Sequence, residues 1–257
     1  MSGSNLNTKN VTRTSNLGEA MKKLVFDILI TLSISLFFIG CVEVINGSAS
    51  TYTEEFTLSD FTGIDARNGF RLEINSGETF SVEITTNTNI REYLEVDVSG
   101  GKLMIKLKSG RTYNNLTLEA KITMPSLVLL NLSGGSRATL NGFSSSDNFT
   151  ANISGGSRLS GNLVAADIYA NPSGGSQINL SGSASILLAT ITGGSQLNLE
   201  GFPVGNVGIN LDGGSTATVN MSGTLDANLS GGSRLYYIGE PTLGEINMSG
   251  GSSINKK

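Results

Sequence analysis

The side chains best suited to bind a ligand recur as pairs in the second half of the chain. The two members of a pair flank one apolar residue, so on an extended strand they share a face. Planar amide and guanidinium groups suit hydroxyl-rich or carboxylate-bearing ligands such as glycans. We therefore predict a flat hydrogen-bonding strip, the alternative being a solvated face without a ligand. Its candidate ligand-facing residues are Arg137, Arg158, Gln177, Asn179, Gln196, Asn198, Arg234 and Tyr236.

Two arginines of this strip are expected to lie side by side. Arg137 and Arg158 would be about one strand spacing apart, and their like charges would repel unless the side chains splay or share an anion. Replacing both by alanine is expected to weaken surface attachment and to leave folding intact.

A different chemistry is indicated by Cys41, the only cysteine of the chain. The basic start Met21–Lys23, the apolar run Leu24–Ile39 and the small Gly40 precede it, as in a signal peptide. The segment Phe38-Ile39-Gly40-Cys41 resembles a lipobox. We predict a lipoprotein signal peptide over residues 21–41, lipidation of Cys41 and a cell-envelope location at the outer membrane or cell surface. A single membrane-spanning anchor is disfavoured, because the apolar stretch is shorter than the roughly 20 residues of a span.

Catalytic and metal-binding side chains are scarce. The chain has no histidine, which removes the commonest neutral-pH base and metal ligand. The slot after the glycines, which calcium-binding β-rolls fill with Asp, holds Arg, Gln, Thr or Ser. A net charge of −4 with no basic cluster argues against nucleic acid. We expect no enzyme, cofactor or metal, with a polysaccharide-active enzyme as the rival. The acids of the repeats fall at different phases: Asp147, Asp167, Glu200, Asp212, Asp226, Glu240 and Glu245.

These side chains must be positioned by a tandem repeat. Gly-Gly-Ser occurs seven times at intervals of 18–21 residues. The residues two and four positions before each Gly pair are apolar, Pro172 apart, and those between them are Asn in six repeats of seven. This alternation predicts strands with one buried face, and the constant interval predicts stacked rungs. A flexible linker would not need apolar residues in phase. The pairs begin at Gly134, Gly155, Gly174, Gly193, Gly213, Gly231 and Gly250.

Two details of the rungs carry further expectations. The Asn column, which begins at Asn131, is expected to hydrogen-bond along the stack. Pro172 lacks an N–H, so a local bulge is expected there.

The same patterns predict how the rest of the chain is divided into segments. Residues 1–20 are expected to be disordered or a mis-assigned start, and residues 42–51 a linker. Residues 52–257 should form a single β-helix domain, with repeats over 129–257. The alternating but irregular strands of 52–128 are either first rungs or a cap, with a hairpin turn at Ser99–Lys102.

Several short motifs resemble one bacterial family, described as putative auto-transporter adhesin, head GIN domain. They are Phe61–Ile64, Gly101–Ile105, Met124–Leu127 and the repeats, including Gly208-Ile209-Asn210. The resemblance implies an all-β fold, a right-handed parallel β-helix, on a secreted or lipid-anchored protein with a role in adhesion.

The expected function is therefore a non-catalytic adhesion or binding module, with an enzyme or a purely structural envelope protein as alternatives. The expected partners are a glycan or surface protein, the membrane through the lipid anchor, and a second copy of the chain. This weak homo-oligomer would pair through the open edge of the last rung.

Overall fold

The computed structural model describes residue 23 and residues 43–257. The signal peptide over 21–41, its lipidation site Cys41 and the segment 1–20 therefore lie outside the described residues, Lys23 apart. Within the described part, no helix has the length and hydropathy needed to cross a bilayer.

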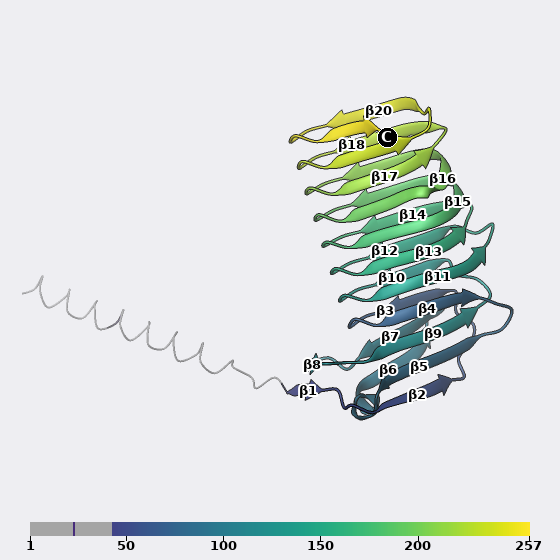
Figure 1. Cartoon of the computed structure of the whole chain (residues 1–257), viewed down its shortest axis with the longest axis vertical. Helices are drawn as coiled ribbons and strands as arrows, with labels where there is room; N and C mark the ends of the chain where they lie inside the picture. Colours follow the sequence, from purple (N-terminus) through teal and green to yellow (C-terminus); the bar gives the residue numbers. More distant parts are fainter. Residues whose placement is uncertain (1–22, 24–42) are drawn as a thin grey trace, which may run out of the picture. The chain divides into compact units, whose positions relative to one another are not determined.

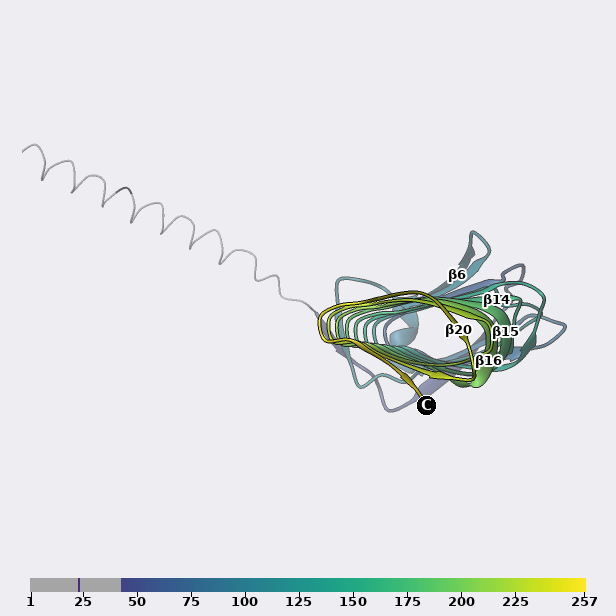
Figure 2. The same ribbon diagram turned by 90° about the horizontal axis from the view of Figure 1, so that it is seen from above.

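Residues 45–257 form one compact unit that is built almost wholly from strands. Each rung consists of two strands joined by a Gly-Gly-Ser corner, and every rung of the repeat pairs in parallel with the next (Figure 1). Seen from above, the coils lie over one another as a flattened ring with tight corners at one end (Figure 2). The predicted all-β parallel solenoid is confirmed.

The strands that precede the corners form one sheet, whose outer surface we call the asparagine face. From the base upward it contains β7 (Lys102–Leu107), β3 (Gly63–Ala66), β10 (Leu129–Leu132), β12 (Phe149–Ile153), β14 (Asp167–Pro172), the second half of β15 (Gln177–Ile191), the second half of β16 (Gln196–Leu211), β18 (Thr224–Leu229) and β20 (Thr242–Met248).

The strands that follow the corners form the opposite sheet, whose outer surface we call the strip face. It contains β9 (Leu118–Met124), β4 (Arg71–Ser76), β11 (Arg137–Ser144), β13 (Arg158–Val164), the first halves of β15 and β16, β17 (Thr216–Met221), β19 (Arg234–Ile238) and β21 (Ser253–Lys256). The two sheets are continuous because β15 and β16 run through both.

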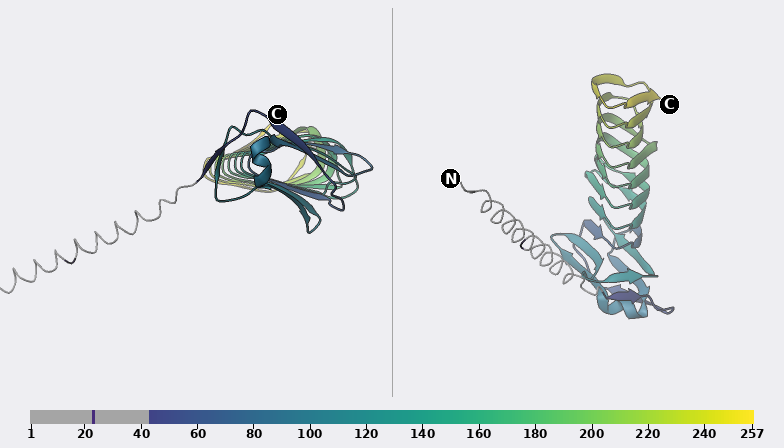
Figure 3. Two further views of the ribbon diagram at one scale, coloured as in Figure 1. Left: turned by 90° about the horizontal axis from the view of Figure 1, so that it is seen from below. Right: turned by 90° about the vertical axis from the view of Figure 1, so that its left-hand side faces the viewer.

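Residues 52–128 contain both a regular rung and a cap that closes the base of the solenoid. β3 and β4 form a regular rung directly beneath β10 and β11. Below them, antiparallel strands close the end: β2 (Thr51–Phe56), β5 (Ser81–Asn87) and β6 (Leu94–Ser99). A short 3₁₀ helix η1 (Thr88–Tyr93) lies across the opening when the stack is seen from below, with Ile90 fully buried (Figure 3).

The segment expected to be a linker contains a strand, and side chains of the domain hold it. β1 (Val44–Asn46) pairs with β8 (Thr112–Asn114) in a small separate sheet. The Asn87 side chain donates to the Ser48 carbonyl at 2.7 Å, and the Asn89 side chain donates to the Asn46 carbonyl at 2.8 Å. Side-chain amides from the base therefore hold this segment against the domain.

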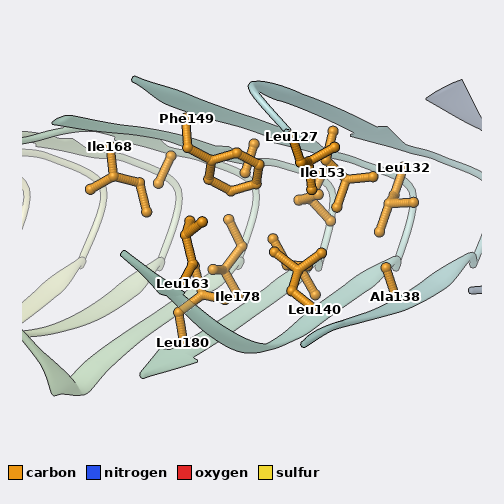
Figure 4. Packing of buried hydrophobic residues seen from close by; sticks show 14 of the residues in the cluster. Leu127, Leu132, Ala138, Leu140, Phe149, Ile153, Leu163, Ile168, Ile178 and Leu180 are labelled. Carbon is orange, nitrogen blue, oxygen red and sulfur yellow. The ribbon is translucent and has the colours of Figure 1, made fainter. Parts of the chain in front are cut away.

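The core lies between the two sheets and is filled by the predicted apolar columns (Figure 4). Leu132, Ile153 and Leu211 from the column before the corners are at most 1% exposed, as are Leu159 and Ile178 from the column after them. The alternation of the sequence thus places the apolar side chains inward over the whole stack. The last rung is the exception, since Met248 is 55% exposed.

The serines of the Gly-Gly-Ser corners are structural residues that close each turn. Six of the seven are completely buried. The Ser176 hydroxyl donates to the Ser173 carbonyl at 2.6 Å, and Ser215 and Ser233 make the same bond three residues back. Because a buried hydroxyl needs a partner, this bond explains the small polar residue after the Gly pair in these corners. The buried Ser157 hydroxyl is an exception, with no hydrogen-bond partner among the described residues.

The expectation of a bulge at Pro172 is wrong. The register between β12 and β14 runs without a shift from Phe149 to Ile153, which lies opposite Pro172. Pro172 is the last residue of its strand, and the Ser173 N–H donates to the Ile153 carbonyl at 2.8 Å. The strand ends there, so a single missing donor does not disturb the ladder. Register shifts instead occur in other strands, for example between Leu140 and Phe143 where β11 pairs with β13.

Candidate functional site

The residues of the predicted strip lie in two columns on the strip face. The first column contains Arg137, Arg158, Gln177, Gln196, Thr216 and Arg234 in unbroken register. The second contains Thr139, Ser160, Asn179, Asn198, Thr218 and Tyr236. All twelve side chains are exposed or half-buried. The geometric part of the prediction therefore agrees with the structure, whereas ligand binding by the strip stays a prediction.

Some side chains of the strip orient one another. The Arg158 Nε donates to the Gln177 Oε1 at 3.1 Å. The hydroxyls of Thr139 and Ser160 are 3.5 Å apart across neighbouring rungs. This bond to a neighbour in the same column orients the guanidinium group of Arg158. A row of partly oriented donors and acceptors is suited to hydrogen-bond an extended ligand along the stack.

Sequence reasoning missed the lower part of the strip. Arg71 of β4 lies directly beneath Arg137, and Glu73 lies beneath Thr139. One strand lower, Glu119 is opposite Arg71 and Lys121 is opposite Glu73. The two columns therefore continue through the base, where they become charged. The only sequence signal for this was the alternation of Phe70–Ile74, which predicts a strand but not its neighbour.

The asparagine face has a second ordered array. The Asn152 side chain donates to Asn131 at 2.9 Å, and Asn171 donates to Asn152 at 2.9 Å. Above Thr190, the ladder resumes: the Asn228 side chain donates to Asn210 at 3.0 Å, and the Asn247 side chain donates to Asn228 at 2.9 Å. The predicted asparagine ladder is confirmed, with one break at Thr190.

A carboxylate stands at the base of this ladder. Asp65 lies in register with Asn131 and is 9% exposed. The Arg67 Nε and Nη2 donate to its two oxygens at 2.9 and 3.1 Å. These bonds hold the pKa of Asp65 below its ordinary value, and a hydrogen bond from Asn131 acts in the same direction, although burial opposes the shift. Asp65 is therefore an ionised acceptor that ends the amide ladder.

Shallow hollows lie along the same face, next to the corners. One of about 420 Å³ is lined by residues of the upper rungs, including Asn210, Asn228 and Ser230. Another of about 240 Å³ lies over the lower rungs and includes Asn131, Asn152 and Ser154. The amides that line them already hydrogen-bond one another, so we interpret these hollows as a consequence of the ladder.

The acidic side chains of the repeats are dispersed over the surface. Within residues 43–257, no three residues among His, Cys, Asp and Glu are grouped as a metal ion requires. Glu200 pairs with Lys257 at 2.6 Å, and Glu240 pairs with Lys256. Asp212 accepts a hydrogen bond from the Ser230 hydroxyl at 2.7 Å, which together with the Gly213 N–H lowers its pKa. In the described part of the repeats, these acids serve as surface partners of neighbouring side chains.

The domain is a parallel β-solenoid with flat, polar outer faces and a closed base. The family model described as putative auto-transporter adhesin, head GIN domain, matches residues 60–241. The chain belongs to this family, and the resemblance seen in its sequence is confirmed. The family's description indicates an adhesion or binding role at the cell surface.

Solved structures show the same fold. A putative adhesin from Bacteroides fragilis is 19% identical with a TM-score of 0.77, and the match covers 83% of this chain and 100% of that one. A putative lipid binding protein from Parabacteroides distasonis is 21% identical with a TM-score of 0.66, over 84% and 100% of the two chains. A putative adhesin from Parabacteroides merdae is 18% identical with a TM-score of 0.63, over 84% and 100%. No curated protein matches this chain.

Proposed function

We propose that this protein is a lipid-anchored, non-catalytic adhesion module of the cell envelope, and that it attaches through its strip face to a glycan or a surface protein. The strip carries the proposal: two columns of exposed polar side chains keep one register over the rungs of the repeat. A ligand that runs along the stack would meet a donor or acceptor at each strand spacing of about 4.8 Å.

A non-catalytic role is supported by the dispersion of the acids. Glycan hydrolysis uses two carboxyl groups that flank one bond. From Arg137 upward neither column of the strip contains a carboxylate, and Glu73 and Glu119 belong to the strands below. A screen for release of new chain ends from a panel of polysaccharides separates the two functions. Turnover of any polysaccharide that depends on the strip face would replace adhesion by catalysis.

The experiment that tests attachment is binding of the full chain to a panel of immobilised glycans and surface proteins. Replacing Gln177, Asn179, Gln196 and Asn198 by alanine should reduce binding, because each substitution removes a hydrogen-bonding group without touching the core. The control variant carries Ser146→Ala and Asn148→Ala, two exposed residues of the loop between β11 and β12. Equal binding by both variants and the unaltered chain would reject the strip.

The lipid anchor rests on the sequence around Cys41 and has its own test. In cells fed radioactive palmitate, the unaltered chain should be labelled and Cys41→Ser should not, because a thioether at this cysteine would carry the lipid. Label retained in Cys41→Ser would reject lipidation at this site.

A weak homo-oligomer is part of the proposal. β20 and β21 are the last strands of the two sheets among the described residues, and Leu243 of β20 is 56% exposed. A strand edge with unpaired backbone groups is a template for pairing. Sedimentation over a range of concentrations should show association, and a monomer at every concentration would exclude it.

A further inference from the structure

Three arginines are stacked at the lower end of the strip face. Arg71 of β4, Arg137 of β11 and Arg158 of β13 occupy the same position of three successive strands. All three are exposed. Their backbone positions are one strand spacing apart, about 4.8 Å, although Arg71 and Arg137 are 66 positions apart in the sequence.

Within the described residues, no carboxylate pairs with these three guanidinium groups. The ion pairs of the domain involve other cations, such as Arg67 with Asp65 and Arg91 with Glu54. The one side-chain hydrogen bond of the three is that of Arg158 with the neutral Gln177. Like charges opposite one another on adjacent strands are destabilising, so this array opposes folding.

The fold itself does not require arginine at this position. Higher in the same column the position is filled by Gln177, Gln196 and Thr216. These rungs have the same Gly-Gly-Ser corner as the rungs of Arg137 and Arg158 and likewise a buried apolar residue next in the strand, and this position carries no charge in them. The arginines are therefore better explained by a partner that neutralises them than by the packing of the rung.

The charges around the three arginines favour an anionic ligand that extends toward the upper rungs. Below Arg71 the first column contains Glu119. The neighbouring column contains Glu73 on the strand of Arg71, then Lys121 and Glu83, so the base is negative on balance. Above Arg158, the column positions Gln177, Gln196 and Thr216 are uncharged, and Arg234 restores a positive charge on the next strand. An anionic ligand is attracted to the three arginines, repelled from the base and free to extend toward the upper rungs.

We propose that this arginine column is the subsite of the strip for an acidic polysaccharide, and that carboxylate or sulfate groups of the polymer bind Arg137 and Arg158, with Arg71 as the lower end. Guanidinium forks bind such planar or tetrahedral oxyanions through paired hydrogen bonds. The neutral amides above then contact the hydroxyl groups of the same chain. The inference rests on the proposed function, since it assigns the ligand class of the same surface.

A polymer fits this geometry better than a membrane surface. The cations form a single line along the stack, and the protein as a whole is acidic, with a net charge of −4. A bilayer of anionic lipids would meet Glu73, Glu83 and Glu119 together with the arginines, because these residues share the flat face. A linear chain can follow the arginine and glutamine column and avoid the acids.

The test measures binding of the full chain to polygalacturonate, with neutral dextran and vesicles of phosphatidylserine and phosphatidylcholine in parallel. The variant is Arg137→Gln with Arg158→Gln, because glutamine occupies the same column at Gln177. The matched control, Lys106→Gln with Lys108→Gln, changes the net charge equally on β7 and the turn after it, in the opposite sheet. Far-ultraviolet circular dichroism checks that both variants fold.

The arginine variant should bind polygalacturonate roughly tenfold more weakly, the control should bind as the unaltered chain does, and raising the salt from about 0.1 to about 1 M should remove most of the difference. Equal binding by the arginine variant would overturn the proposal. So would arginine-dependent binding to the vesicles without binding to the polysaccharide.

The two variants distinguish failure of the acidic-polysaccharide subsite from failure of the proposed adhesion function. If the arginine variant still attaches to the glycan and surface-protein panel while the variant of Gln177, Asn179, Gln196 and Asn198 does not, the strip is an attachment surface and the acidic-polysaccharide subsite is wrong. If no form of the chain attaches to anything on the panel, the proposed function itself fails.

Discussion

The two glycines of each corner are expected to differ in how well they tolerate a side chain. In the corner at Gly193 and Gly194, both residues have a positive φ, 63° and 71°. A Cβ on Gly193 would lie 3.1 Å from the backbone nitrogen of Gly174, in the corner beneath. A Cβ on Gly194 would have nothing within 4 Å. The matched substitutions Gly193→Ala and Gly194→Ala therefore separate backbone conformation from packing between rungs.

The magnitudes follow from these two terms. The left-handed conformation costs an alanine about 1–2 kcal/mol, and reduced freedom of the unfolded chain offsets about 0.4–1 kcal/mol of this. Gly194→Ala should thus lower the free energy of unfolding by about 1 kcal/mol. Gly193→Ala adds a clash with backbone that cannot move aside, because the Gly175 N–H donates to the Gly193 carbonyl at 2.9 Å and ties the two corners together. Overpacking of this kind costs about 1–3 kcal/mol more.

Urea unfolding followed by far-ultraviolet circular dichroism measures the difference. The two variants should unfold with similar slopes, and Gly193→Ala should have the lower midpoint. Gly194→Asn should recover part of the loss, since asparagine adopts positive φ more readily than alanine. Equal losses for the two alanine variants, or a greater loss for Gly194→Ala, would refute the assignment of the first glycine to packing between rungs.

Two further predictions concern the asparagine face. Thr190→Asn should join the two halves of the ladder, because its amide would lie between Asn171 and Asn210, and should raise the free energy of unfolding by about 1 kcal/mol; a lower thermal midpoint than the unaltered chain would contradict this. Asp65→Asn should remove a pH-dependent part of stability. The folded pKa of Asp65 is lowered, chiefly by the Arg67 hydrogen bonds, so its contribution is present above the unfolded pKa and is lost as the pH falls below about 4. The stability difference between Asp65→Asn and the unaltered chain should shrink with acid over that window, and a constant difference from pH 6 to pH 3 would exclude the linkage.

The repeats could be predicted from the sequence because their signals are local. The inward position of Leu132, Ile153 and Leu211 follows from a period of two along one strand, and the stacking of Asn131 on Asn152 follows from the constant interval between corners. Both patterns are read within one rung or between successive rungs. The burial of Ser176 and its partner at Ser173 were missed, because the sequence shows a small residue at the corner but not the direction of its hydroxyl.

The sequence by itself determined the class of fold, the inward and outward faces of each repeat and the two columns of the strip. Only the tertiary structure decided what lies beneath them. Between β4 and β10 the chain descends to build the base, so β10 pairs with β3 rather than with β9, which precedes it in the sequence. Asn68 then takes the place of the first glycine in the lowest corner, because its side chain meets the Leu107 N–H of the base instead of another corner. Pairing between such distant segments depends on packing of the whole domain, which no local period encodes, and it is this pairing that places Arg71 beneath Arg137.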